Sequence, residues 1–316
     1  MNKRYNSLNA WLKNYFRDRV YKVTLESGCT CPNLDGTVGS HGCIFCNFLS
    51  YLPATNPNDL KTSLAKIPIN QQLENGLKYA KKRHGSTKAI AYFQSGSNTH
   101  GDSDTLQSIF EEAISHPQIV GLAISTRPDC IRKEHLEIFK SLASKKLLWI
   151  ELGLQSSHNL TLERIGRGHS VETFQQTCSK LNDINIPVCA HVILGLPGET
   201  KKMMLDTARF LNSSKIWGVK IHNLHVLKNT AIEKQFNAGE IKIPSLETYA
   251  NWAADFLEVL SPEIIIHRVS SHSPKSITVA PAWSTNKLAI FNEVEKELER
   301  RNTHQGKKFT PQRLGF

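Results

Sequence analysis

Four of the seven cysteines in this chain lie within a stretch of eighteen residues, at Cys29, Cys31, Cys43 and Cys46. Cys43 and Cys46 have the C-x2-C spacing that places two thiolates on one metal centre. Eleven residues separate Cys31 from Cys43, and three of them are glycines, which let the backbone wrap closely around a compact inorganic group. Because thiolates bind both zinc and iron–sulfur clusters, the segment predicts a site for a metal or a metal cluster.

The spacing leaves both of these centres open. Three thiolates, from Cys31, Cys43 and Cys46, would hold a 4Fe–4S cluster and leave one iron free for a substrate or cosubstrate. With Cys29 there are four thiols, as a structural zinc site requires, but such sites usually use two C-x2–4-C pairs and Cys29-Thr30-Cys31 is a tighter C-x-C. The spacing therefore favours a cluster without excluding zinc.

The composition is that of a folded, basic protein. The 316 residues are long enough for one large domain with an extension, and an odd number of cysteines argues against a disulfide framework. The 39 lysines and arginines against 28 acids give a net charge of +11, which suits a polyanionic partner or a solvated basic surface equally well. No apolar run reaches membrane-spanning length and the N-terminus lacks a signal-type stretch, so we expect a cytoplasmic protein without a membrane partner.

Strands and helices alternate along most of the chain, which is typical of βαβ units that build a parallel sheet. We expect six strands, at 20–25, 89–93, 119–125, 147–154, 186–194 and 216–227. We expect helices between them, at 71–83, 104–115, 133–144, 171–181 and 201–211. Six units are fewer than the eight of a closed barrel, so the pattern fits a partial barrel or an open doubly wound sheet. Beyond Leu227 we expect helices at 231–238, 246–260 and 287–301, a strand at 264–269 and a loop at 274–284.

The cysteine segment reads CPNLDGTVGSHGCIFCN from Cys31 to Asn47. It resembles the CPN-x-DG-x6-C-x2-CN loop of bacterial radical S-adenosylmethionine (SAM) proteins of the YhcC group, relatives of the Elongator catalytic subunit. The resemblance covers about Tyr5 to Asn292. It implies that Cys31, Cys43 and Cys46 hold a 4Fe–4S cluster, without Cys29. It also implies an α/β fold, a partial (β/α)6 radical SAM barrel with a C-terminal α/β extension, divided into residues 1–19, 20–228 and 229–316.

Polar residues follow the second and third expected strands, where ligands sit in parallel α/β folds. Gln94 and Gly96 occupy the place where many radical SAM proteins have a GGE-like turn that meets the methionine amino group. Ser125 and Thr126 are expected to hydrogen-bond the SAM ribose or methionine moiety. For Gly96 an ordinary turn, and for the segment after Ser125 ordinary strand-end chemistry, are the structural alternatives.

The fourth expected strand ends in Glu151-Leu-Gly-Leu-Gln-Ser156, and Arg164-Ile-Gly-Arg-Gly-His169 follows. This pairing resembles the E-x-G-x-Q-S … RGH signature of Elongator-like proteins and of oxygen-independent coproporphyrinogen oxidase. By that resemblance Gln155 contacts the SAM ribose and Arg167 its carboxylate, and Glu151 is expected to pair with a barrel lysine or arginine.

The sixth expected strand places two polar side chains on one face. By the two-residue period of a strand, Lys220 and His222 point the same way and His225 the other. Polar residues on an otherwise buried strand indicate that it lines a cavity, so Lys220 and His222 are the candidates for substrate contact or proton transfer.

The resemblance implies an enzyme in which a reduced 4Fe–4S cluster cleaves SAM to a 5′-deoxyadenosyl radical that abstracts hydrogen from the substrate. The relationship to Elongator-type enzymes and the net charge point to the wobble uridine of tRNA, with a reductant such as flavodoxin or ferredoxin. A non-radical SAM-dependent methyltransferase and a zinc-stabilised RNA-binding module are the alternatives. If tRNA is the substrate, we expect these basic residues around the pocket mouth: Lys81, Lys82, Arg83, residues 164–169, Lys228, Lys307, Lys308 and Arg313.

Overall fold

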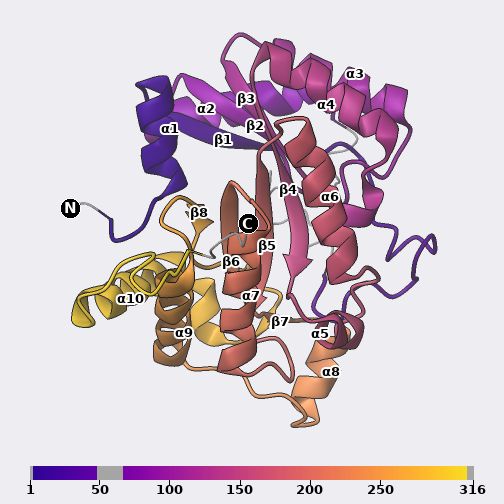
Figure 1. Ribbon diagram of the computed structural model, residues 1–316. Helices are drawn as coiled ribbons and strands as arrows, with labels where there is room; N and C mark the ends of the chain where they lie inside the picture. The colour runs from indigo at the N-terminus through magenta and orange to yellow at the C-terminus, as the bar shows by residue number, and fades with distance from the viewer. Residues whose placement is uncertain (1–2, 48–66, 312–316) are drawn as a thin grey trace, which may run out of the picture.

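Seven parallel strands form one curled sheet in the computed structural model, which describes residues 3–47 and 67–311 (Figure 1). The order of the strands is β1-β2-β3-β4-β5-β6-β8, so the first six strands follow one another in chain order and β8 lies beside β6. Strands β1 and β8 are the two edges, and the sheet forms a half-barrel, as the resemblance predicted. The strands are β1 (Val20–Leu25), β2 (Lys88–Phe93), β3 (Ile119–Thr126), β4 (Leu147–Gln155), β5 (Val188–Leu194), β6 (Gly218–Asn223) and β8 (Ile265–Arg268).

Most of the helices cover the outer face of the half-barrel (Figure 1). Their apolar stripes recur at helical spacing, and most begin at a serine, threonine, aspartate or asparagine cap. The helices are α1 (Leu8–Phe16), α2 (Ile69–His84), α3 (Ser103–Ser115), α4 (Lys133–Lys145), α5 (Asn159–Arg164), α6 (Val171–Asp183), α7 (Lys201–Ser213), α8 (Ala231–Asn237), α9 (Leu246–Val259) and α10 (Lys287–Arg300).

Most expected elements are present with bounds that differ by one or two residues. The last expected strand of the core is interrupted: β6 ends at Asn223 and a short strand, β7 (Val226–Leu227), follows. The expected loop at 274–284 contains β9 (Thr278–Ala280), which pairs antiparallel with β7. Helices α1 and α5 were not expected, because both are short and lack a long apolar period.

The two faces of the half-barrel have different chemistry, and β4 shows the difference most clearly. Leu148, Ile150, Leu152 and Leu154 pack into the main core beneath the helices. The alternate residues point inward and include Trp149 and Glu151. A strand that is apolar on one face and polar on the other is expected when the second face lines a cavity.

Helix α1 packs across the gap between the two edge strands. It contacts both β1 and β8, and a parallel bridge joins Ser7 to Ile266. Leu8 and Leu12 of this helix pack against the inward-facing Tyr92 and Trp149. Helix α1 therefore covers the amino-terminal end of the interior, where Leu8 and Leu12 also line the cavity, whereas the loops after the strands surround the opposite end.

Candidate active site

The cysteine loop begins where β1 ends and is held against the loop that follows β2. Ser97 N donates to Thr30 O at 2.9 Å. Gly96 has φ +72°, and a Cβ at this position would lie 2.4 Å from Cys29 O. Gly96 therefore permits both the left-handed turn and the close approach of the two backbones. This agrees with the alternative in which Gly96 is an ordinary turn glycine.

The three cysteines of the motif line one cavity of about 1,590 Å³. Local hydrogen bonds shape the loop around them: Leu34 N donates to Cys31 O at 2.8 Å, and Cys46 N donates to Cys43 O at 2.9 Å. Burial, and then the proximity of Cys43 and Cys31, raises the pKa of the Cys46 thiol to about 12. Such a group of thiols ionises together only when a cationic metal centre compensates their charge.

The number of thiols at the cavity bears on which metal centre the loop can hold. Cys29 is not among the described residues that line the cavity; a Cβ on Gly101 would lie 3.4 Å from its sulfur. The cavity thus offers three thiols, the number that would leave one iron of a 4Fe–4S cluster open.

Two nitrogen atoms approach the sulfur of Cys43. Asn33 Nδ2 lies 3.6 Å from Cys43 Sγ and also donates to Gly166 O at 2.6 Å. Arg167 Nη1 lies 3.7 Å from the same sulfur. Both donors are buried, and both would stabilise a thiolate at this position.

Arg167 is fixed to the end of β4. Its Nη2 donates to Gly153 O at 2.7 Å and its Nε to the same oxygen at 3.3 Å. A Cβ on Gly153 would lie 2.5 Å from Arg167 Nη2 and 2.9 Å from Gln155 Nε2, so only glycine leaves room for both side chains. Gln155 has φ +76°, which is uncommon for a residue other than glycine. Such backbone conformations are concentrated at functional sites.

The residues after β2 and β3 lie at the same cavity but have different partners. Thr126 Oγ1 is 2.6 Å from Thr99 Oγ1, whereas Ser125 Oγ donates to Glu151 Oε2 at 3.2 Å. Gln94 and Gly96 also line the cavity. The neighbouring Arg127 forms a two-point ion pair with Asp129, and its Nη1 is buried without a partner among the described residues.

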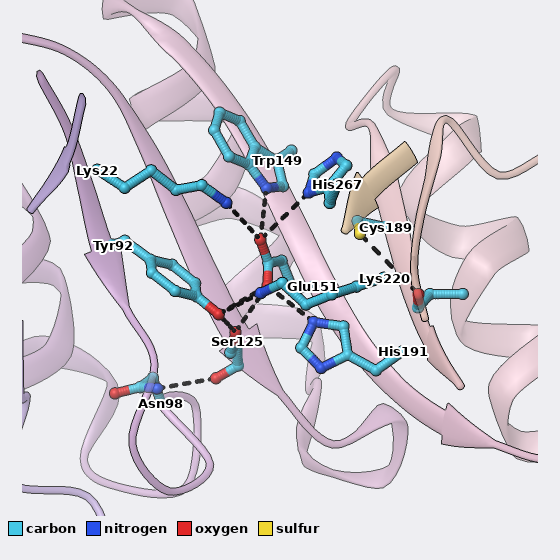
Figure 2. Close-up of polar contacts among 11 residues, drawn as sticks. Lys22, Tyr92, Asn98, Ser125, Trp149, Glu151, Cys189, His191, Lys220 and His267 are labelled. Atoms are coloured by element: carbon cyan, nitrogen blue, oxygen red, sulfur yellow. Dashed lines mark hydrogen bonds and ion pairs between the residues drawn. The ribbon is translucent and has the colours of Figure 1, made fainter. Parts of the chain in front are cut away.

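Glu151 is the centre of a buried network inside the half-barrel (Figure 2). Lys220 Nζ donates to its Oε2, which also accepts from Tyr92 at 2.8 Å and from His191 at 2.7 Å. Its Oε1 accepts from Trp149 at 3.1 Å and lies 3.8 Å from Lys22 Nζ. The structure therefore confirms that Glu151 pairs with a barrel lysine.

The charges of this network are strongly perturbed. Burial alone would raise the pKa of Glu151, but Lys220 and Lys22 hold it well below its usual range. Burial lowers the pKa of Lys220 to about 7, although Glu151 opposes the change. Glu151, Cys189 and His267 have ligand atoms within 4.8 Å of one another, but the two lysines already compensate the carboxylate, so we assign no metal to this group.

Residues 36–211 match the model of the radical SAM superfamily, and residues 216–300 match the radical SAM C-terminal domain. The chain belongs to the radical SAM superfamily. Members of this superfamily bind a 4Fe–4S cluster and SAM. The division at residues 19/20 and 228/229 stays a prediction, and β8, from beyond residue 228, extends the sheet by pairing with β6.

Relatives cover almost the whole radical SAM chain. It is 38% identical to the uncharacterized protein YtqA of Bacillus subtilis, over 97% of this chain and 93% of YtqA. It is 32% identical to protein YhcC of Escherichia coli, over 94% of this chain and 93% of YhcC. A tRNA uridine(34) acetyltransferase of Methanocaldococcus infernus is 31% identical over 53% of this chain, but only 31% of that protein is covered.

The half-barrel is also found in the solved structure of an archaeal Elp3 from Methanocaldococcus infernus, which lacks its N-terminal residues 1–46. The TM-score is 0.67 at 18% identity, over 90% of this chain. This chain spans 64% of the length of that structure, so the likeness shows a common fold.

All eleven site residues expected from the sequence line the one cavity of this radical SAM protein. They are Cys31, Cys43, Cys46, Gln94, Gly96, Ser125, Thr126, Gln155, Arg167, Lys220 and His222. Sequence reasoning missed Lys22, Tyr92, His191 and Arg268, which line the same cavity. The missed signal was a polar residue among apolar neighbours in a buried strand, as at Lys22 in VYKVTL and His191 in VCAHVIL.

The basic residues expected around the pocket mouth lie at two edges of the sheet. Residues 164–169 and Lys228 follow strands, and therefore lie at the carboxyl edge with the cysteine loop. Residues 81–83 end the helix that precedes β2, and Lys308 pairs with Glu258 near the end of α9, so both lie toward the amino edge. Arg313 lies outside the described residues.

No helix in the described part of the chain is long and apolar enough to cross a membrane.

Proposed function

We propose that this radical SAM enzyme modifies tRNA, with the wobble uridine as the target base. The observation that carries the proposal is the charge of the cavity. Among the described residues, ten lysine and arginine side chains line it, and Glu151 is the single acidic one. A cavity with this charge favours a polyanionic substrate.

Two further facts support RNA as the substrate. The relative from Methanocaldococcus infernus is named a tRNA uridine(34) acetyltransferase, and its similarity lies in about half of this chain. A wobble base lies in a single-stranded loop, so it can be splayed into a deep pocket without opening a duplex.

In this proposal Cys31, Cys43 and Cys46 hold the cluster, and Gln155 with Arg167 face SAM. When bound, the cluster supplies the electron that cleaves SAM. Arg167 and Asn33 stabilise the thiolate of Cys43, and Gly153 leaves space for Arg167 beside Gln155. Lys220 is held by Glu151, and His222 lies two residues closer to the carboxyl edge on the same strand. Lys220 and His222 are the proposed substrate-side groups.

The alternatives from the sequence are not supported by these findings. A structural zinc site requires a fourth ligand besides the three thiols that line the cavity, and a non-radical methyltransferase does not require those three cysteines.

The test is a comparison of tRNA nucleosides by mass spectrometry in a parent strain, a deletion strain, and deletion strains that carry the intact gene or Cys43→Ala. We expect the deletion to lose or change a wobble uridine nucleoside. The intact gene should restore it, and Cys43→Ala should not. Identical nucleosides in all four strains would exclude tRNA as the substrate while leaving the radical SAM assignment in place.

A further inference from the structure

Arg268, the last residue of β8, is a cation in the cavity without a counterion. In the part of the chain that the structure describes, its guanidinium forms no hydrogen bond or ion pair, although the residue is half-buried and lines the cavity. Arg268 pairs in register with Lys220 of β6, so a second buried cation lies on the adjacent strand.

The carboxylate inside the half-barrel is already saturated. Glu151 accepts from Lys220, Tyr92 and His191 at one oxygen, and from Trp149 at the other, beside Lys22. Glu151 is the single acidic residue among the described residues that line the cavity. Among the described residues, no acidic group is therefore left to compensate Arg268.

A second polar group in the same region lacks a partner. His222 Nε2 is buried without a hydrogen bond among the described residues, and the side chain lines the cavity. Burial lowers the pKa of His222 well below its usual range, and Arg268 is the charge that lowers it most. The imidazole is thus neutral and close to Arg268, and its unpartnered nitrogen can donate a hydrogen bond in the tautomer with the proton on Nε2.

We propose that Arg268 and His222 form an anion-binding subsite inside the half-barrel, which holds a carboxylate or phosphate group of the substrate. An arginine fork matches the two oxygens of either group, and a neutral imidazole adds one N–H. The neighbouring Lys220 adds positive charge while it remains bonded to Glu151.

The subsite is distinct from the arginines beside the thiols. Arg167 donates to Gly153 O and Arg127 pairs with Asp129, and both come from loops at the carboxyl edge. Arg268 and His222 come instead from β8 and β6. The inference rests on the proposed function only in assigning this end of the cavity to the substrate.

The experiment measures the reaction of each arginine with phenylglyoxal in the cluster-loaded protein, by peptide mass spectrometry. We expect Arg268 to react faster than Arg127 and Arg301, because those two are held in ion pairs. Inorganic phosphate or acetate should slow modification of Arg268 several-fold relative to chloride at the same ionic strength. The exposed Arg209 should show no such protection. Protection by acetate alone indicates a substrate carboxylate, and protection by phosphate alone indicates a phosphate group.

Matched variants and control ligands keep the result interpretable. The variant His222→Gln should reduce the protection of Arg268 by the anion, while Lys202→Gln, on the exposed surface, should not. Equal protection by chloride would overturn the proposal. So would protection by SAM alone, because Arg268 would then belong to the cosubstrate site. Because these probes contain no RNA, anion protection together with unchanged tRNA nucleosides would support the subsite and refute the proposed tRNA substrate.

Discussion

Arg167 Nη1 lies 3.7 Å from Cys43 Sγ, while Nε and Nη2 of the same guanidinium donate to Gly153 O. One side chain therefore joins the end of β4 to the cysteine loop. The sequence resemblance assigned Arg167 to the SAM carboxylate. Arg167 also lies beside the sulfur of Cys43. Because hydrogen bonds and positive charge near cluster sulfurs raise the reduction potential of a cluster, we expect Arg167 to raise it here.

The first prediction concerns the ligands of the cluster. Replacement of Cys31, Cys43 or Cys46 by Ala should abolish most iron incorporation, because each variant loses one of three thiolates. Cys29→Ala is the matched control, since its sulfur faces Gly101 outside the cavity lining. Iron and labile sulfide analysis, with an electron paramagnetic resonance spectrum of the anaerobically reduced protein, checks the result. A fully loaded Cys43→Ala protein would contradict the assignment.

The second prediction concerns Arg167. Arg167→Gln should lower the midpoint potential of the cluster, because one N–H donor and a positive charge near Cys43 are lost. If Arg167 also holds the SAM carboxylate, affinity for SAM should fall about tenfold or more, since a charged hydrogen bond contributes about 1.5–3 kcal/mol. Arg164→Gln is the control, because Arg164 is exposed and bonds to Pro197 O. Redox titration and equilibrium binding of SAM separate the two roles, and an unchanged potential would remove the first.

Sequence reasoning located the cysteine loop and the strands because both follow local rules. The C-x2-C pair and its glycines are contiguous, and strands such as Leu147–Gln155 are apolar at alternate positions. The network around Glu151 could not be read in this way. Its members come from β1, β2, β4, β5 and β6, and the sheet order that brings Lys22 and Lys220 to one carboxylate is a property of the tertiary fold. Arg268 was missed because its importance depends on tertiary contacts: it has no counterion among the described residues.

The third prediction concerns the buried ion pair. Glu151→Gln should destabilise the fold by about 3–5 kcal/mol, because Lys220 and Lys22 would lose their buried counterion. The double variant Glu151→Gln with Lys220→Met should recover part of that loss, since it removes one uncompensated charge. Lys140→Met, on an exposed pair with Glu137, should change stability by less than about 1 kcal/mol. Urea unfolding measures all three, and additive effects of the two core substitutions would refute coupling.

The fourth prediction concerns acid stability. Burial lowers the pKa of His135, His191 and His225 to about 4, so these side chains stay neutral in the native state. Between pH 6.5 and about 4 the unfolded chain binds protons that the native chain does not. The free energy of unfolding should therefore fall as the pH is lowered through this window, and should be nearly flat with respect to these groups above it.

His135 provides the variant for that test, because it lies in α4 and does not line the cavity. Its Nδ1 accepts from Arg132 N at 3.0 Å. His135→Gln should reduce the proton uptake on unfolding by about one below pH 6. Urea midpoints measured from pH 4.5 to 7.5 give the slope. A slope identical to that of the parent protein would show that His135 is already protonated in the folded state.

The last prediction concerns the edge of the sheet that meets RNA. A base that reaches the cavity near the thiols must enter from the carboxyl edge, where Arg164 and Lys228 are exposed. Each phosphate contact contributes about 0.7–0.9 to the slope of log affinity against log salt concentration. The double variant Arg164→Gln with Lys228→Gln should therefore bind bulk tRNA more weakly at low salt and show a shallower slope. Lys81→Gln with Lys82→Gln removes the same charge from the end of α2, toward the amino edge, and should leave the slope unchanged. Filter binding between about 50 and 200 mM salt measures both. Equal loss in the two double variants would show a diffuse attraction to the whole basic surface, and the carboxyl edge would then have no special role in docking.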